Sequence, residues 1–124
     1  MDAEVIERKP LPDSGKRSEF ETGSVRDACE GKGIPSLIPV SALRSVAKRF
    51  EDGATKYGRD NWKKGQAITE LLGSLFRHII AFQNGEDLDE ESGKSHIGHA
   101  MCNLLFIQYV LDNHKHFDDR KKGA

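Results

Sequence analysis

Hydrophobic positions along the chain fall into three helix-spaced segments, separated by glycine-rich or acidic stretches. In the first segment, over about residues 41–57, apolar side chains recur every three or four positions: Leu43, Val46, Phe50, Ala54 and Tyr57. This spacing places them on one side of a helix. Ser41 is the expected N-cap of that helix. Gly58 is the expected end, because glycine readily takes a positive φ.

Two further segments complete the predicted architecture. The second, about 67–84, has a wide apolar face and ends before Gly85. The third, about 95–113, is apolar on nearly every side in its middle, which is typical of a helix buried in the monomer or at a subunit interface. No alternating pattern indicates strands. We therefore predict an all-α bundle of three main helices, and we expect oligomerisation to complete its thin core.

The ends of the chain differ from its centre in composition. Residues 1–24 are polar, contain prolines and glycines, and show little periodicity, so we expect a flexible N-terminal arm. Residues 25–114 then form the helical domain. Residues 115–124 are a polar tail, which we expect to fray.

Length, charge and cysteine content narrow the function classes. The 124 residues suit one domain, and 19 basic against 20 acidic residues argue against a dedicated binder of nucleic-acid polymers. No secretory signal or membrane-spanning run is apparent. Cys29 and Cys102 are too few for a disulfide scaffold or a cysteine zinc site, which favours reduced thiols in a cytoplasmic protein. A small enzyme, a ligand-binding protein or an interaction module remains.

An acidic connection between the second and third helices holds five carboxylates within residues 86–91. Carboxylate oxygens are the ligands that Mg²⁺ prefers. The spacing is not that of an EF-hand, because the glycine falls at Gly93 and the twelfth position is Gly98. The alternative interpretation is a solvated acidic loop.

Polar residues also fall on predicted helix faces. His96, His99 and Asn103 share one face of the third helix and could be ligands or a hydrogen-bonded core cluster. His78 lies with the apolar face of the second helix, as either a core residue or an acid–base group. Its neighbour Arg77 could bind phosphate or remain a surface arginine.

Other candidates surround the end of the first helix. Trp62 could stack on a base or fill the core, and Asn61 could read a base edge. Lys32, between two glycines, weakly resembles a phosphate-binding loop. No serine-nucleophile elbow and no His-Glu-x-x-His motif is present, so nucleophilic catalysis is not supported.

Several short stretches, over about residues 23–111, together resemble a bacteriophage family described as the dATP/dGTP diphosphohydrolase N-terminal domain, related to MazG-like all-α nucleotide pyrophosphohydrolases. The matching stretches are Gly31-Lys32-Gly33, Leu37-Ile38-Pro39, Phe50-Glu51-x-Gly53-Ala54-x-Lys56-Tyr57-Gly58, Asn61-Trp62, Ser74-Leu75-x-Arg77-His78, Gly85-Glu86-x-x-Asp89, Glu91-Ser92-Gly93 and His96-x-x-His99-Ala100-x-x-Asn103.

The resemblance implies divalent-metal-dependent hydrolysis of a deoxynucleoside triphosphate to monophosphate and pyrophosphate. It also implies a homodimer or homotetramer. The chain departs from the wider MazG-like pattern, because the helices lack its Glu-x-x-Glu and Glu-x-x-Asp motifs at the usual places, with Asn103 where Asp belongs. The anionic metal ligands would then come from Glu51, Glu86 and Asp89.

Our leading hypothesis is thus an Mg²⁺- or Mn²⁺-dependent enzyme for a purine substrate such as dATP or dGTP. The expected metal ligands are Glu51, Glu86, Asp89, His99 and Asn103. The expected catalytic residues are His78, Glu86 and Asp89. The expected substrate-binding residues are Lys32, Lys56, Tyr57, Asn61, Trp62, Arg77 and His96. The alternatives are a phage protein that binds a nucleotide without turnover and, less favoured, a helical interaction module.

Overall fold

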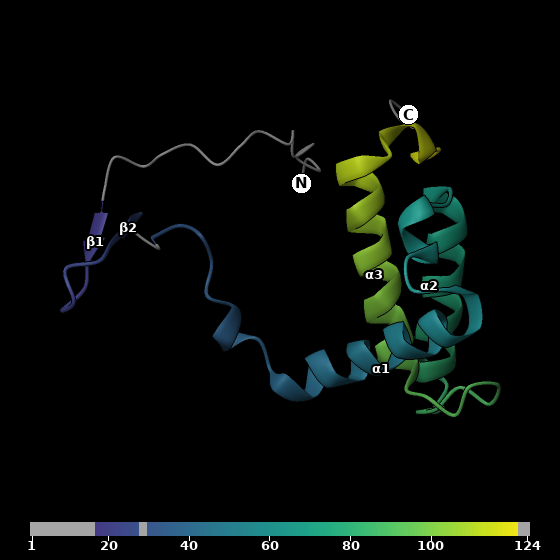
Figure 1. Cartoon of the computed structure of the whole chain (residues 1–124). Helices are drawn as coiled ribbons and strands as arrows, with labels where there is room; N and C mark the ends of the chain where they lie inside the picture. The colour runs from purple at the N-terminus through teal and green to yellow at the C-terminus, as the bar shows by residue number, and fades with distance from the viewer. Residues whose placement is uncertain (1–16, 28–29, 122–124) are drawn as a thin grey trace.

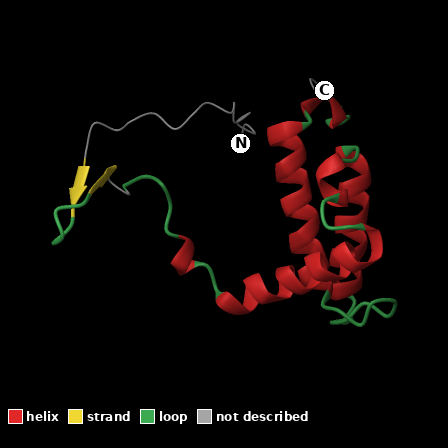
Figure 2. Cartoon of the chain, in the orientation of Figure 1, coloured by secondary structure: helices red, strands yellow, loops and turns green. Residues whose placement is uncertain are grey.

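Three long helices dominate the computed structural model, which describes residues 17–27 and 30–121. They are α1 (Val40–Tyr57), α2 (Ile68–Gln83) and α3 (His96–Asn113) (Figures 1 and 2). A short 3-10 turn over Asn61–Lys64 lies between α1 and α2, and a loop joins α2 to α3. The predicted all-α class and its three main helices are confirmed, with ends within one residue of those expected. None of the described helices combines the length and apolar character that crossing a membrane requires.

The core lies between α2 and α3, which pack side by side (Figure 1). Its buried centre is formed by Ile68 and Leu71 of α2 and Val110 of α3. Five partly buried side chains pack around it: Leu72, Phe106, Ile107, Leu111 and Phe117. By contrast, α1 contains no fully buried residue. The bundle is therefore a tight helix pair with a third helix laid across it.

The approach of α1 to α3 is controlled by a glycine. Gly98 is buried in the first turn of α3, and a Cβ placed on it would stand 2.5 Å from Ser45 Oγ on α1. One turn further along α3, the Cys102 thiol lies 3.7 Å from the Val46 carbonyl oxygen of α1. With the Ser45 hydroxyl in this position, glycine at position 98 leaves the space in which the two helices meet.

The predicted start of α1 is wrong, whereas its predicted end is confirmed. Helix α1 begins at Val40 rather than after Ser41, because the Pro39 carbonyl already accepts hydrogen bonds from the Ala42 and Leu43 amides at 3.1 and 3.2 Å. At the other end, Gly58 has φ +98°, and its amide donates to the Ala54 carbonyl. The glycine therefore ends the helix as expected.

The tail was expected to fray, but its described part is held against the helices. A 3-10 turn over Lys115–Phe117 places Phe117 against the core. The Asp119 carboxylate then accepts hydrogen bonds from the Thr69 amide (3.0 Å) and hydroxyl. Since Ala67 at the start of α2 has no side chain for capping, Asp119 caps that helix from fifty residues away.

A short hairpin lies away from the helices in Figure 1 and was not predicted. Strands β1 (Arg17–Glu19) and β2 (Val25–Asp27) pair antiparallel, with Gly23 at φ +84° in the connection. Three-residue strands are too short to show alternation. The N-terminal part of the expected arm, and Cys29, lie outside the described residues, whereas Cys102 is a free, buried thiol.

Candidate functional site

A cavity of about 270 Å³ opens between α1, α2, α3 and the 3-10 turn over Asn61–Lys64. We call it the aromatic pocket. Its lining includes Arg49, Phe50, Gly53, Tyr57, Asn61, Trp62, Glu70, Ser74, His99, Cys102, Asn103 and Phe106. Five of these are predicted site residues from three separate segments: Tyr57, Asn61, Trp62, His99 and Asn103.

Trp62 forms part of the pocket wall and also packs within an aromatic cluster. Its ring meets Phe50 edge to face at a centroid distance of 5.3 Å, and Tyr109 at 4.7 Å. Phe106 lies 5.8 Å away. The two interpretations of Trp62 are thus compatible: core contacts fix an indole that lines the pocket.

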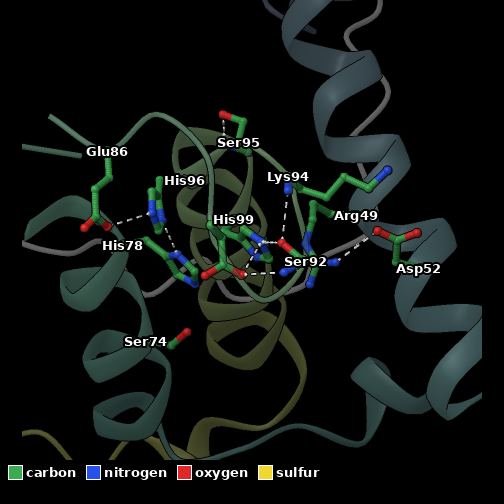
Figure 3. A network of polar contacts seen from close by, with 12 residues as sticks. Arg49, Asp52, Ser74, His78, Glu86, Ser92, Lys94, Ser95, His96 and His99 are labelled. Atoms are coloured by element: carbon green, nitrogen blue, oxygen red, sulfur yellow. Dashed lines mark hydrogen bonds and ion pairs between the residues drawn. The ribbon is translucent and has the colours of Figure 1, made fainter. Parts of the chain in front are cut away.

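Three imidazoles meet beside the pocket (Figure 3). The rings of His78 and His99 are stacked 4.3 Å apart. His78 Nδ1 and His96 Nδ1 lie 2.9 Å apart, within hydrogen-bonding distance. Together with Glu86, Asp89 and Ser92, these residues form what we call the histidine network.

The acidic connection, residues 84–95, is folded into an ordered loop that supplies the rest of the network. Backbone hydrogen bonds from the Asp89 amide to the Lys94 carbonyl (2.8 Å) and from the Gly93 amide to the Asp89 carbonyl (2.7 Å) close the loop. The Asp89 carboxylate accepts from the Ser92 amide at 3.1 Å. This folding turns Asp89 toward α3 instead of leaving the whole acidic run solvated.

Two carboxylates face two histidines in the network. Asp89 Oδ2 lies 3.6 Å from His99 Nε2, and Glu86 Oε2 lies 3.6 Å from His96 Nε2. The Ser92 hydroxyl is closer to His99 Nε2, at 2.8 Å. His96 Nε2 is buried and has no hydrogen-bond partner in the described chain. Buried polar atoms are usually paired, so the network has unused hydrogen-bonding capacity.

Burial and charge set the protonation of the network. Burial, followed by the positive charge of Arg49, lowers the pKa of His99 from 6.5 to about 4. Burial and the charge of His96 also lower the pKa of His78. For Asp89, burial alone would raise the pKa, but hydrogen bonds from Ser92 lower it. His99 is therefore neutral, and Asp89 ionised, near neutral pH.

His99 connects the network to the pocket, since it belongs to both. Asn103, one turn further along α3, donates from its amide nitrogen to Ser74 Oγ at 3.1 Å and to the His99 carbonyl at 3.2 Å. These bonds join α2 to α3 at the pocket wall and hold the segment that carries His99. The shared helix face predicted for His99 and Asn103 is thus confirmed: both residues are buried on α3 and line the aromatic pocket.

The structure leaves four predicted residues outside both features. Lys32, Glu51, Lys56 and Arg77 are exposed and line neither the aromatic pocket nor the histidine network. Lys56 lies instead over the Tyr57 ring, 5.1 Å from its centroid. Glu51 is therefore not brought to the other predicted metal ligands.

Several residues of the site were not predicted. Arg49 and Glu70 bring charge to the aromatic pocket, and Ser92 joins the network although it was considered only as part of a matching stretch. Arg49 could have been found from periodicity, because it lies three and four positions from Val46 and Gly53 beside the apolar stripe. No local pattern could have revealed the contact between Ser92 and His99.

The donor set does not form a complete metal cage. Among the described residues, no group of three His, Cys, Asp or Glu side chains is placed to hold a metal ion. Glu70 lines the aromatic pocket, and the carboxylates of Asp89 and Glu86 lie in the histidine network beside it. Mg²⁺ is commonly held by one or two carboxylates together with substrate phosphates, and this arrangement fits the donors present better than an all-protein site.

Taken together, the helices define a small all-α protein whose aromatic pocket, beside buried histidines and two carboxylates, is the candidate ligand site. Residues 22–120 match the family described as dATP/dGTP diphosphohydrolase, N-terminal. The chain belongs to this family. A curated protein of Salmonella phage PMBT28, named dATP/dGTP diphosphohydrolase, is 38% identical over 95 residues. The match covers 77% of this chain but 32% of that relative, so the chain spans about a third of its length. No solved structure matches.

Proposed function

We propose that this chain hydrolyses a (deoxy)nucleoside triphosphate, with a purine such as dATP or dGTP as substrate, to the monophosphate and pyrophosphate. The observation that carries the proposal is the position of His99, which lines the aromatic pocket and contacts Ser92 and Asp89. A ligand in the pocket would therefore lie against a group that can exchange protons. Family membership and the name of the phage relative support the same reaction. Control of nucleotide pools in the cytoplasm of a phage-infected cell is the expected setting.

The pocket suits the base end of the substrate. Trp62 and Tyr57 offer aromatic surface, and Asn61 can both donate to and accept from a base edge. Pockets for whole drug-sized ligands hold roughly 300–1,000 Å³. At about 270 Å³ the aromatic pocket has room for a base rather than a complete nucleotide, so the phosphates extend beyond it.

In the proposed reaction a water oxygen bonds to the α-phosphorus, the anhydride bond to the β-phosphate breaks, and pyrophosphate leaves. The proton released by the water passes to the histidine network, where neutral His99 or His78 can accept it. The charge of Asp89 favours a proton on His99 or His78, and the Glu86 carboxylate faces His96. In this proposal His78, Glu86 and Asp89 keep the catalytic roles predicted for them. His99, which was expected only as a metal ligand, joins them as a proton acceptor.

Divalent-metal dependence is part of the proposal. Asp89 and Glu86 would supply the protein carboxylates, and the substrate phosphates would complete the coordination. A bound Mg²⁺ or Mn²⁺ would neutralise phosphate charge and polarise the α-phosphorus. Glu51 has no part in this arrangement, because it lies outside the pocket and the network.

The test is product release from each nucleoside and deoxynucleoside triphosphate, with and without Mg²⁺ or Mn²⁺. We expect metal-dependent monophosphate and pyrophosphate from purine deoxynucleotides, and a loss of at least about 100-fold in kcat for His99→Gln. His116→Gln, outside the pocket and the network, is the matched control. Nucleotide-dependent stabilisation without product would support the non-catalytic binder instead. If neither product formation nor nucleotide-dependent stabilisation is observed, both the enzyme hypothesis and the binder hypothesis are overturned.

Exposed apolar side chains support the expected homo-oligomer. Phe76 and Ile80 of α2 are 57% and 56% exposed, and Leu104 of α3 is 54% exposed. Such surface, together with an α1 that buries no residue, fits a second copy of the chain as its cover. Sedimentation should show a dimer or tetramer, and Ile80→Glu or Leu104→Glu should dissociate it. A monomeric wild-type protein would contradict this.

A further inference from the structure

A second depression, of about 490 Å³, lies between α1 and the loop that leads into α3. Four cationic residues line it: Arg44, Lys48 and Arg49 from α1, and Lys94 from the loop. No carboxylate is among its lining residues. We call it the basic depression. In a chain with a net charge of -1, such a concentration of positive charge indicates an anionic ligand.

Most of the cations that line the basic depression have no ion-pair partner among the described residues. Arg44, Lys48 and Lys94 form no ion pair with any described residue. Arg49 pairs with Asp52 at 3.2 Å, but its Nε is buried and has no hydrogen-bond partner in the described chain. Like charges held together cost stability, and within the described residues the Arg49–Asp52 pair is the one ion pair that offsets this cost.

Helix α1 and the loop place these residues around the depression. Arg44 and Lys48 are four residues apart on α1, so they lie on one face of the helix. The loop is held by the bond from the Lys94 amide to Ser92 Oγ at 3.1 Å. The loop that carries the catalytic candidates thus also presents a cation to the depression.

The basic depression and the aromatic pocket share Arg49, which lines both. The shared position puts Arg49 at the border between a space with room for a base and a space lined by cations. The charge of Arg49 also acts on His99 and His78. A ligand that spans both spaces would therefore pass the histidine network at their junction.

We propose that the basic depression binds the phosphate chain of the nucleotide. The base occupies the aromatic pocket, Arg49 binds near the α-phosphate, and Arg44, Lys48 and Lys94 bind the β- and γ-phosphates. Arginine can bind phosphate oxygens in a fork, and lysine acts as a point charge. The assignment to a nucleotide rests on the proposed function, whereas binding of a bare polyphosphate does not. This assignment of the phosphates differs from the expectation that Lys32, Lys56 and Arg77 bind the substrate.

The test uses inorganic tripolyphosphate as the probe, with titration calorimetry on the full chain. The wild-type protein should bind tripolyphosphate, with lower affinity at high salt. The double variant Arg44→Gln/Lys48→Gln should lose about tenfold or more in affinity, because each charge-assisted hydrogen bond is stronger than a neutral one. Lys115→Gln/Lys121→Gln removes the same charge outside both cavities and is the matched control. Equal losses in the two variants, or no binding by the wild type, would overturn the proposal.

A second measurement separates this site from the proposed reaction. In NMR spectra, the backbone amide chemical shifts of Gly93, Lys94 and Ser95 should change on adding pyrophosphate, which would locate binding in the basic depression. If the probe binds there and no nucleotide is hydrolysed, the site stands and the reaction fails. If nucleotides are hydrolysed and Arg44→Gln/Lys48→Gln leaves KM unchanged, the reaction stands and the site fails.

Discussion

The rings of His78 and His99 lie face to face, with centroids 4.3 Å apart and planes within 3° of each other. Two protonated imidazoles at this separation would repel each other. Burial on α3 adds to this effect for His99, and so does the nearby charge of Arg49. The stacked pair is therefore arranged to stay largely uncharged at the pH where a hydrolase would work.

This arrangement predicts how stability depends on pH. The pKa of His99 is about 4 in the folded protein, against an ordinary value of 6.5. Between these values the unfolded chain binds a proton that the folded chain does not, so stability falls as pH falls from 6.5 toward 4. Urea unfolding at pH 7 and pH 4.5 should show this loss, and His99→Gln should reduce it. The same pH dependence in His99→Gln and in the control His116→Gln would contradict the prediction.

Removal of the distant cap should loosen both the tail and the start of α2. Asp119→Ala removes the acceptor for the Thr69 amide and hydroxyl, so the melting temperature should fall at pH 7. These bonds lower the pKa of Asp119 below 3.8. The stabilisation is thus present above that value and is lost as the pH falls through the lowered pKa.

The matched control for the cap is Glu90→Ala, which removes an exposed carboxylate from the loop. We expect it to leave the melting temperature nearly unchanged. Equal effects from the two variants would show that Asp119 acts only through net charge. Hydrogen exchange of the Thr69 amide gives an independent readout, and it should speed up only in Asp119→Ala.

The contact between α1 and α3 can be tested with one methyl group. Gly98→Ala places a Cβ 2.5 Å from Ser45 Oγ, so the Ser45 hydroxyl or the helices must shift, and overpacking of this kind costs about 1–3 kcal/mol. Ser45→Ala removes that oxygen, and the Ser45 Cβ lies at an ordinary 3.7 Å. The double variant should therefore recover most of the stability in denaturant unfolding. Additive losses would mean that the two residues do not meet.

Replacing Gly53, inside α1, should stabilise the protein rather than destabilise it. Gly53 lines the aromatic pocket, and a Cβ there meets no atom within 4 Å. Gly53→Ala should stabilise the helix by about 0.5–1 kcal/mol but weaken nucleotide binding, because the methyl group takes up ligand space. Gly73→Ala on α2, outside the pocket lining, should stabilise without that loss. Unchanged nucleotide affinity in Gly53→Ala would remove this part of the pocket from the binding site.

How far the sequence could predict this structure depended on the range of the interactions. The three helices follow from spacings of three and four residues, and Gly58 ended α1 as expected because its role is local. The start at Val40 was missed, since Pro39 accepts the first helical bonds without any side-chain cap. The docked tail was missed for the opposite reason: Asp119 meets Thr69 across fifty residues.

The candidate site shows the same division. Helical spacing correctly placed His99 and Asn103 on one face, and Trp62 could be assigned to the pocket by its chemistry. Spacing could not show that an acidic run would close into a loop and bring Ser92 to His99. Nor could a nearly neutral composition reveal the basic depression, which forms only where α1 passes that loop.

The bond between Ser92 and His99 makes the acidic loop an indicator of what the pocket contains. A ligand that favours one orientation of the His99 ring also favours one arrangement of residues 84–95. If a pocket ligand strengthens binding of a second molecule to the ordered loop, thermodynamic reciprocity requires that molecule to strengthen binding of the ligand by the same factor. If the pocket binds a base as proposed, recognition of the base and alignment of the loop carboxylates are linked equilibria, and a poorly fitting base would leave the loop less well aligned for the proposed reaction.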